Sequence, residues 1–478
     1  MKKLFYLLAI FVFTACSSAN KETQIIILST NDMHAMIDNY GKVAAYIDKV
    51  RAENKNVLLL SGGDMFSGNP IVDQHDDKGY PMIEIMNKIG YDFGVIGNHE
   101  FDYGQDFLFK RIEQAKFPLL CANMKVSEKS VIKQPEPYVM LKMDGIEICI
   151  LATIQVENLN GKLIPSTHPD KVHNIDFFQP VETALQYKNL RRQCDVFIAL
   201  SHNGIDEDVI LANEMPELDV IIGGHSHTRV DGMIENGVLI SQTECYLKYI
   251  GKTTIKMKGK TIVEKKFELI DVSTLQDKNE ELQALINKYY DETPLNEVAG
   301  RAVADFKGKE NLGGLMTDAV AKNFNLDIAF QNSGGIRIDE IAKGDISLLQ
   351  LYKLDPFDNY VIVFELSYDE IYSLLKNSYK SESKYADLKT SGISYSIKVK
   401  NNEVVDIEIR DAKGNPLDKN RKYMTGMNSF IASAYKFDHK DAGKSLNVKS
   451  AVALVEYVKQ QKEVNPQPDR TKIEEITD

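Results

Sequence analysis

Five short apolar runs in the first half of the chain each end in residues that bind metal ions or transfer protons. Each run predicts a buried β-strand, and the runs begin at Ile25, Val57, Tyr91, Val196 and Val220. In α/β proteins the carboxyl ends of parallel strands meet at one edge of a sheet, where ligands bind. We therefore expect the polar residues that follow these runs to gather at one edge of one sheet.

The residues that follow the five runs form a set of nitrogen and oxygen donors suited to divalent ions. They are Asp32, His34, Asp64, Asn98, His202, His225 and His227. Each alone is more often a helix cap, a turn residue or an ordinary surface residue. Together they are enough for two ions if one carboxylate bridges them, because a catalytic ion usually takes three protein ligands. Mixed imidazole, carboxylate and amide donors suit zinc, manganese or cobalt better than magnesium.

His99 and Asp102 follow Asn98 directly and predict a proton-handling pair beside the metals. A carboxylate three residues after a histidine can fix the tautomer of the ring and raise its proton affinity. A protonated His99 could then donate to a phosphoryl oxygen or to a leaving group. The plainer alternative is that Asp102 caps the next helix and His99 is a surface residue.

Alternating strand and helix patterns divide the 478 residues into two α/β domains. We assign residues 22–274 to a first domain, 275–297 to a helical linker and 298–478 to a second, smaller domain. Hairpins are predicted at Asp144-Gly145, near Gly259 and at Asn401-Asn402. Strands, hairpins and interleaved helices of this kind favour a layered α/β sandwich.

The first 20 residues predict a signal sequence. A positive start, an apolar run too short to span a bilayer and a small residue before Cys16 resemble a bacterial lipobox. We expect an exported lipoprotein, anchored to a membrane through Cys16 and facing the periplasm or the cell surface. The alternative is a plain signal peptide in which the cysteine is incidental.

Net charge and cysteine spacing argue against a nucleic-acid partner and against a thiolate metal site. A net charge of -12 argues against a partner that is a nucleic-acid polymer, because proteins that bind such polymers are usually basic. The sequence contains no Cys-x-x-Cys spacing, so a thiolate metal site is not expected.

The motifs together resemble the calcineurin-like metallophosphoesterases. In the first domain the resemblance rests on Asp32-Met-His34, Gly62-Gly-Asp64, Gly97-Asn-His-Glu-Phe-Asp102, Ser201-His-Asn203 and Gly224-His-Ser-His227. In the second it rests on Asn311-Leu-Gly-Gly-Leu, Asn332-Ser-Gly-Gly-Ile-Arg337 and Pro356-Phe-Asp-Asn, which are similar to the carboxy-terminal domain of 5′-nucleotidases. The resemblance implies a four-layer αββα sandwich followed by a smaller α/β substrate-binding domain.

The resemblance also implies roles for individual residues. One ion would be held by Asp32, His34, Asp64 and His227, and the other by Asp64, Asn98, His202 and His225, with Asp64 as the bridge. His99 and Asp102 would be the catalytic pair. In the second domain Asn332 and Arg337 would contact the substrate, and Phe357 and Phe430 would stack on the nucleobase. The segment after Phe430 lacks the glycines and the acid that the family commonly has there.

The expected function is hydrolysis of nucleoside monophosphates by hydroxide generated on two divalent ions. The alternatives within the family are a UDP-sugar or dinucleotide pyrophosphatase and a 2′,3′-cyclic-nucleotide phosphodiesterase. From another class, the chain could be a nucleotide-binding surface protein without catalysis, although the complete set of polar residues argues against it.

Overall fold

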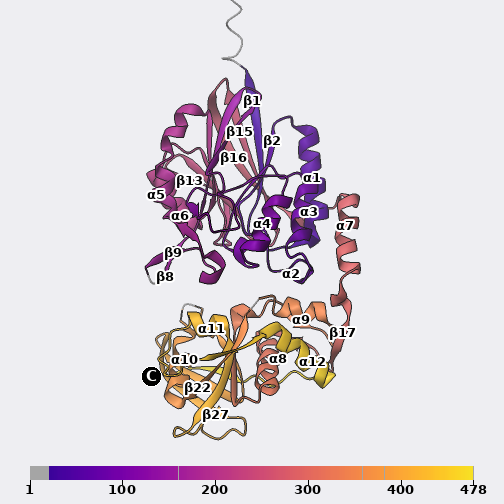
Figure 1. Ribbon diagram of the computed structural model, residues 1–478, viewed down its shortest axis with the longest axis vertical. Helices are drawn as coiled ribbons and strands as arrows, with labels where there is room; N and C mark the ends of the chain where they lie inside the picture. The colour runs from indigo at the N-terminus through magenta and orange to yellow at the C-terminus, as the bar shows by residue number, and fades with distance from the viewer. Residues whose placement is uncertain (1–20, 160, 358, 382, 477–478) are drawn as a thin grey trace, which may run out of the picture. The chain divides into compact units, whose positions relative to one another are not determined.

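The chain folds into two α/β units. A computed structural model describes residues 21–159, 161–357, 359–381 and 383–476. One unit contains the described residues up to Ser67 together with Gln74–Tyr289, and the other contains Gly68–Asp73 and the described residues from Tyr290 onward. The two-domain α/β architecture predicted from the sequence is therefore confirmed (Figure 1).

The first domain contains two six-stranded sheets. The first sheet has the order β16-β15-β1-β2-β3-β4, and its strands are β1 (Glu22–Thr30), β2 (Val57–Ser61), β3 (Phe93–Val95), β4 (Leu119–Leu120), β15 (Tyr249–Lys258) and β16 (Thr261–Asp271). Strands β1 to β4 run parallel, and the β15–β16 hairpin adds to β1 antiparallel. The predicted turn at Gly259 joins this hairpin.

The second sheet has the order β13-β14-β12-β11-β7-β6. Its strands are β6 (Tyr138–Met143), β7 (Ile146–Ile154), β11 (Val196–His202), β12 (Val220–Ile222), β13 (Arg229–Glu235) and β14 (Val238–Thr243). Strands β7, β11, β12 and β14 are parallel. The expectation that all five polar-ended strands lie in one sheet is wrong, because β1, β2 and β3 belong to the first sheet and β11 and β12 to the second.

The two sheets pack face to face, which is why residues from both can still converge. The shared core is aliphatic and includes Ile25 and Ile27 from the first sheet and Ile148, Ile198 and Val220 from the second, all 0% exposed. Burial of apolar side chains on this scale is the main stabilising contribution to such a sandwich.

Helices cover the two outer faces of the sandwich. Figure 1 shows α1 (Tyr40–Glu53) and α3 (Tyr80–Ile89) on the side of the first sheet, and α5 (Pro180–Leu185) and α6 (Ile205–Glu214) on the side of the second. The buried residues of α1 recur at helical spacing, as in Val43, Ile47 and Val50. These layers make the αββα sandwich that the family resemblance implied.

Helix α7 (Glu280–Asp291), in the segment assigned to a linker, packs on the first domain. Its apolar residues Leu282 and Ile286 are buried, and Glu281 pairs with Lys88 at 2.8 Å. The division between the two units falls after Tyr289, near the end of this helix.

The second domain is built on a five-stranded mixed sheet. Its order is β25-β19-β28-β22-β29, with β19 (Ile328–Asn332), β22 (Tyr360–Ser367), β25 (Leu388–Ser391), β28 (Lys422–Asn428) and β29 (Lys444–Lys449). Strands β19 and β28 are parallel, whereas β22 is antiparallel to β28. The carboxyl ends of β19 and β28 and the start of β22 therefore lie at the same edge of the sheet.

Both faces of this sheet are covered. One face packs on α8 (Gly308–Asn323) and α12 (Ser450–Gln461), and the other packs on α10 (Tyr368–Asn377) and the hairpin of β26 (Ile393–Lys400) and β27 (Glu403–Asp411). The predicted turn at Asn401-Asn402 joins that hairpin, and both asparagines have positive φ, as a two-residue turn of this kind requires.

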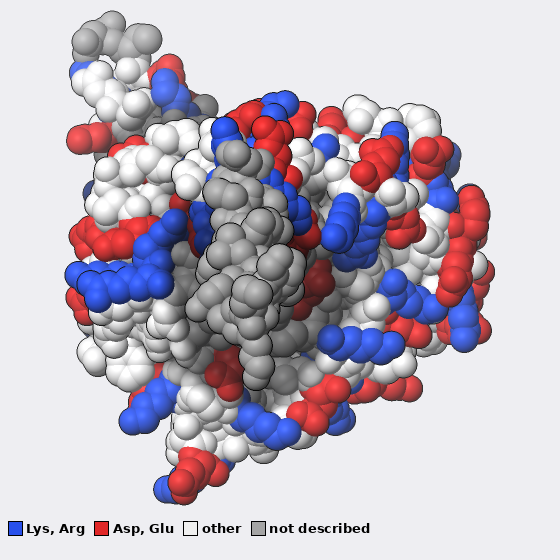
Figure 2. Space-filling view, turned by 90° about the horizontal axis from the view of Figure 1, so that it is seen from above, with Lys and Arg blue, Asp and Glu red and all other residues white. Residues whose placement is uncertain are grey.

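The surface carries charges of both signs. On the face drawn in Figure 2, the basic and acidic side chains lie intermixed and are not separated by sign. None of the helices in the described part of the chain is long and apolar enough to span a lipid bilayer. The predicted signal sequence and Cys16 lie outside the described residues.

Candidate active site

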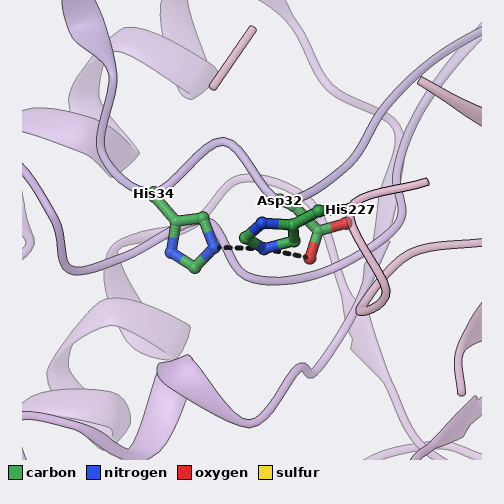
Figure 3. A group of neighbouring side chains, drawn as sticks. All are labelled: Asp32, His34 and His227. Atoms are coloured by element: carbon green, nitrogen blue, oxygen red, sulfur yellow. Dashed lines mark hydrogen bonds and ion pairs between the residues drawn. The ribbon is translucent and has the colours of Figure 1, made fainter. Parts of the chain in front are cut away.

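Asp32, His34 and His227 meet at the carboxyl ends of β1 and β12 (Figure 3). The Nε2 atoms of His34 and His227 are 3.0 Å apart, and His227 Nε2 lies 3.5 Å from Asp32 Oδ1. The carboxylate of Asp32 is fully buried, whereas the side chain of His227 is 35% exposed. The group is thus a buried acid with two imidazoles, reachable from solvent on one side.

A second group joins the two sheets of the sandwich and consists of Asp64, His202 and His225. His202 Nε2 lies 3.1 Å from Asp64 Oδ1 and 3.1 Å from Asn98 Oδ1. His225 Nδ1 lies 3.0 Å from the same oxygen of Asn98. Four side chains from four different strand ends therefore point at one another.

Asp64 and His34 connect the two groups. A third set of donors consists of His34, Asp64 and His99, and His34 Nε2 lies 4.0 Å from Asp64 Oδ2. Asp64 therefore turns one oxygen toward each group, a placement that suits a bridging carboxylate. All seven predicted ligands are brought together in the first domain.

The ring of His202 points its Nε2 atom at the acceptors of the site. Its Nδ1 donates to the Gly62 carbonyl oxygen at 2.7 Å, and its Nε2 lies between the Asp64 and Asn98 oxygens. Burial disfavours the charged ring, but Asp64 and Asp32 outweigh it and raise the pKa of His202 to about 9, so without a metal ion Nε2 holds a proton among these acceptors. A divalent ion bound there would take the place of that proton. The donor set therefore fits the divalent ions expected from the sequence.

Burial and neighbouring charges set the protonation of these side chains. Burial, together with the nearby charge of His99, lowers the pKa of His34 to about 3, and burial with the charge of His202 lowers the pKa of His225 to about 4. Both rings are neutral at pH 7, as metal ligation requires. Burial opposes ionisation of Asp64, but His202 and His99 hold its pKa well below the usual range.

Five of the candidate ligands adopt left-handed backbone conformations. The φ angles are 48° at Asp32, 46° at His34, 51° at Asp64, 80° at His225 and 54° at His227. Such angles are uncommon for residues other than glycine, and they cluster at functional sites because surrounding contacts hold them.

His99 and Asp102 form the predicted pair. His99 Nδ1 lies 2.7 Å from Asp102 Oδ2, and both side chains are about one-third exposed, at 32% and 31%. Burial opposes protonation of the ring, but the carboxylates of Asp102 and Asp64 outweigh it and raise the pKa of His99 to about 10. The ring is therefore a proton donor at neutral pH, and its centroid lies 4.9 Å from that of His34.

Two residues with no assigned role in the sequence analysis support this site. Glu100 is fully buried and accepts hydrogen bonds from the amides of Gly97, Asp64, Met65 and Phe66, at 2.6 to 3.2 Å. Its place inside the Gly97–Gly104 string is the sequence feature from which a role for Glu100 in the site could have been predicted. Ser67 donates from Oγ to Asp102 Oδ2 at 2.6 Å, and nothing in the local sequence marked it.

In the second domain, Arg337 and Phe357 lie together. The Arg337 guanidinium carbon is 5.4 Å from the centroid of the Phe357 ring, a cation–π distance. Arg337 is exposed, and its backbone amide donates to the Leu354 carbonyl at 3.1 Å. The guanidinium group of Arg337 thus lies at the surface, against the ring of Phe357.

Asn332 and Phe430 lie at the same edge of the five-stranded sheet. Asn332 ends β19, is 6% exposed, and accepts from Asn428 Nδ2 at 3.0 Å. Phe430, in α11 (Ser429–Ala434), is 49% exposed, and its ring meets Tyr435 edge-on at 6.3 Å. Ser429 Oγ bonds to the side chain of Asn359, which ties the Phe430 segment to the chain just after Phe357.

Comparison with known proteins bears on both domains. The family description "Calcineurin-like phosphoesterase" matches residues 25–229, and "5'-nucleotidase, C-terminal domain" matches residues 293–437. The chain is 30% identical to a 5'-nucleotidase of Vibrio cholerae over 434 residues, which cover 75% of this chain and 76% of that protein. It is also 29% identical to Endonuclease YhcR of Bacillus subtilis over 91% of this chain, but it spans 39% of that longer relative.

The fold has a counterpart among solved structures. A 5'-nucleotidase precursor from Thermus thermophilus superposes with a TM-score of 0.77 at 25% identity, covering 95% of this chain and 99% of that one. These matches extend over both domains and agree with the convergence of the motif residues. The chain belongs to the 5′-nucleotidase family of calcineurin-like phosphoesterases.

Proposed function

We propose that the chain is a metal-dependent phosphohydrolase that releases phosphate from nucleoside 5′-monophosphates. The observation that carries the proposal is the meeting of seven nitrogen and oxygen donors around Asp64, next to the His99–Asp102 pair. The 5′-nucleotidase relatives and the matching second domain favour a nucleotide as the substrate. Nucleoside and inorganic phosphate are the products.

The first domain supplies the reaction chemistry. When bound, two divalent ions supply a water of lowered pKa and positive charge next to the phosphate oxygens. Asp64 bridges between the two ligand groups, and the neutral rings of His34 and His225 are ready to coordinate. His99, held by Asp102, donates from its other ring nitrogen to a phosphoryl oxygen or to the departing ribose oxygen. Zinc, manganese and cobalt are the ions that this donor set favours.

The second domain supplies recognition of the nucleotide. Phe357 and Phe430 offer aromatic faces on which any base can stack, which gives affinity without strict base specificity. Arg337 offers a charged fork for phosphate or ribose oxygens, and Asn332 offers an amide. These four assignments follow the family pattern.

A second candidate is a phosphodiesterase or pyrophosphatase of the same family, acting on 2′,3′-cyclic nucleotides, UDP-sugars or dinucleotides. The segment after Phe430 favours this candidate, because Tyr435 occupies the flank of the ring where the family's glycine-rich string is missing. Near Asn311, where relatives often place an arginine, Glu310 pairs with Lys389, and Lys309 donates to the Ser333 carbonyl at 2.8 Å. The relative named an endonuclease also acts, by its name, on phosphodiesters.

A substrate panel tests the proposal. Purified protein is stripped with a chelator, reloaded with manganese or zinc and assayed on AMP, UDP-glucose and 2′,3′-cyclic AMP. We expect phosphate release from AMP, and we expect His99→Ala to lower it by about 100-fold or more. His168→Ala, which removes an exposed histidine of the same domain, should leave the rate unchanged. A pyrophosphatase or a cyclic phosphodiesterase would release a nucleotide and no inorganic phosphate, so the nucleotide products are also separated by chromatography. Turnover of none of the three substrates would leave only a nucleotide-binding role.

We also propose that the protein is exported and held at a membrane by lipid on Cys16. The support is the sequence of the first 18 residues, in which a positive start and a short apolar run precede Ala15-Cys16. Metabolic labelling with a radioactive fatty acid would test this, because only a lipoprotein should incorporate the label.

A further inference from the structure

Ser67 has all three of its polar groups committed within the candidate site. Its hydroxyl donates to Asp102 Oδ2 at 2.6 Å, and its amide donates to the Tyr103 hydroxyl at 3.0 Å. Its carbonyl oxygen lies 3.2 Å from His34 Nδ1 and accepts that proton. One residue thus contacts both the proposed proton-donor pair and a proposed metal ligand.

The hydroxyl of Ser67 bears directly on the orientation of Asp102. The Oδ2 atom of Asp102 accepts from two donors, His99 Nδ1 at 2.7 Å and Ser67 Oγ at 2.6 Å. The carboxylate is 31% exposed, so without the second donor it could turn toward water. Two donors converging on one oxygen fix the plane of the carboxylate, and the carboxylate in turn fixes the His99 ring.

The backbone at Ser67 supports a functional reading. Its φ is 57°, in the left-handed region that residues other than glycine seldom adopt. Glycine would fit this conformation with less strain. Serine carries a conformational cost at this position, and the only side-chain atom it adds beyond Cβ is the hydroxyl oxygen bonded to Asp102.

We propose that Ser67 is a positioning residue for phosphate release, which orients His99 through Asp102 and links that pair to the backbone that holds His34. The inference rests on the proposed function. Ser67 lies outside the recognised motifs, and in this role it fixes the position of the proton donor relative to the metal ligands. The effect of the hydroxyl should fall on the rate of the chemical step and not on metal binding, because the contact with His34 is made by the backbone.

The test uses the full chain with two substitutions that remove the same hydroxyl. Ser67→Ala keeps the strained backbone, whereas Ser67→Gly relieves it. We expect both to lower kcat for AMP about tenfold, the effect of losing one hydrogen bond to a charged group, with KM changed less than about twofold. Thermal stability should instead differ between the two variants, with Ser67→Gly the more stable.

Three controls separate positioning from general disruption. Ser130→Ala removes a hydroxyl bonded at 2.7 Å to Gln105, away from the candidate ligands, and should leave kcat unchanged. Manganese affinity, measured by calorimetry, should be unchanged in Ser67→Ala. In an Asp102→Ala background, Ser67→Ala should cause no further loss, because there is no carboxylate left to orient.

The same experiments distinguish an error about Ser67 from an error about the proposed function. An inactive wild type on every substrate overturns the function. If the wild type is active, three results would each overturn the role of Ser67. They are an unchanged kcat in Ser67→Ala and Ser67→Gly, a kcat that changes in parallel with thermal stability, and an equal loss of kcat from Ser67→Ala in the Asp102→Ala background. A crystal structure of Ser67→Ala decides independently of activity, since Asp102 should leave its present contact with His99, and an unmoved carboxylate contradicts the inference.

Discussion

Replacing Glu100 should show how much its hydrogen bonds to the loop that carries Asp64 contribute to the stability of the first domain. Its two carboxylate oxygens accept four backbone N–H groups, from Gly97 and Asp64 on one oxygen and from Met65 and Phe66 on the other. Replacing Glu100 by glutamine turns one oxygen into an NH₂ group. Whichever way the amide is placed, two buried donors then face another donor.

The expected destabilisation follows from these contacts. A buried polar group left without a partner costs about 1–3 kcal/mol, so two such groups cost about 2–6 kcal/mol. Glu100 is fully buried, so water cannot replace the lost oxygen without a rearrangement of the loop. The matched control is Glu113→Gln, whose side chain is 51% exposed and pairs with Lys133 at the surface. That change should stay below about 0.5 kcal/mol.

Cysteine labelling can confine the measurement to the first domain. The second domain contains no cysteine, whereas Cys121 and Cys149 are fully buried in the first. Their rates of thiol modification in increasing urea, with chelator present to remove metal linkage, report the unfolding free energy of that domain alone. A difference below about 1 kcal/mol between Glu100→Gln and wild type would refute the reasoning, because the four amides would then not depend on having two carboxylate oxygens as acceptors.

Further predictions concern the ligands, the substrate and the anchor. Asp64→Asn should lower phosphate release more than about 100-fold and lower the metal content measured by mass spectrometry; unchanged metal content would contradict the bridging role. Phe430→Ala should raise KM for AMP about tenfold, because stacking on an aromatic ring contributes about 1–3 kcal/mol, and should spare hydrolysis of glycerol phosphate, which has no base. An equal loss on both substrates would place Phe430 elsewhere in the mechanism. Cys16→Ser should move the protein from the membrane fraction to the soluble fraction, and continued sedimentation with membranes would exclude a lipid anchor at that residue.

The sequence predicted which side chains of the first domain gather, because the signal for them is local. An apolar run that ends in Asp, His or Asn identifies both a strand and the end at which a side chain can bind a ligand, as at Asp64 and His202. The turns were equally local, since Asn401-Asn402 and Asp144-Gly145 suit the backbone that a tight hairpin requires. The chemical roles of the gathered side chains stay predictions for the experiments above.

The errors and omissions came from contacts that are distant in the sequence. Whether β2 and β11 share a sheet depends on pairing that no single run encodes, so two face-to-face sheets were predicted as one. The roles of Glu100 and Ser67 depend on hydrogen bonds to residues far along the chain, 35 positions away for the Ser67 bond to Asp102. Neither residue type is unusual, and of the two only Glu100 lies inside a recognised string, the one from Gly97 to Gly104.

The left-handed conformations of Asp32, His34, Asp64, His225 and His227 have a consequence for attempts to improve this protein. Each costs the fold about 1 kcal/mol or more relative to glycine at the same angle. A selection for heat resistance alone would therefore enrich glycine at these five places and discard the donors one by one. Any library built to stabilise the first domain should keep these codons fixed and seek its gains in the outer helices.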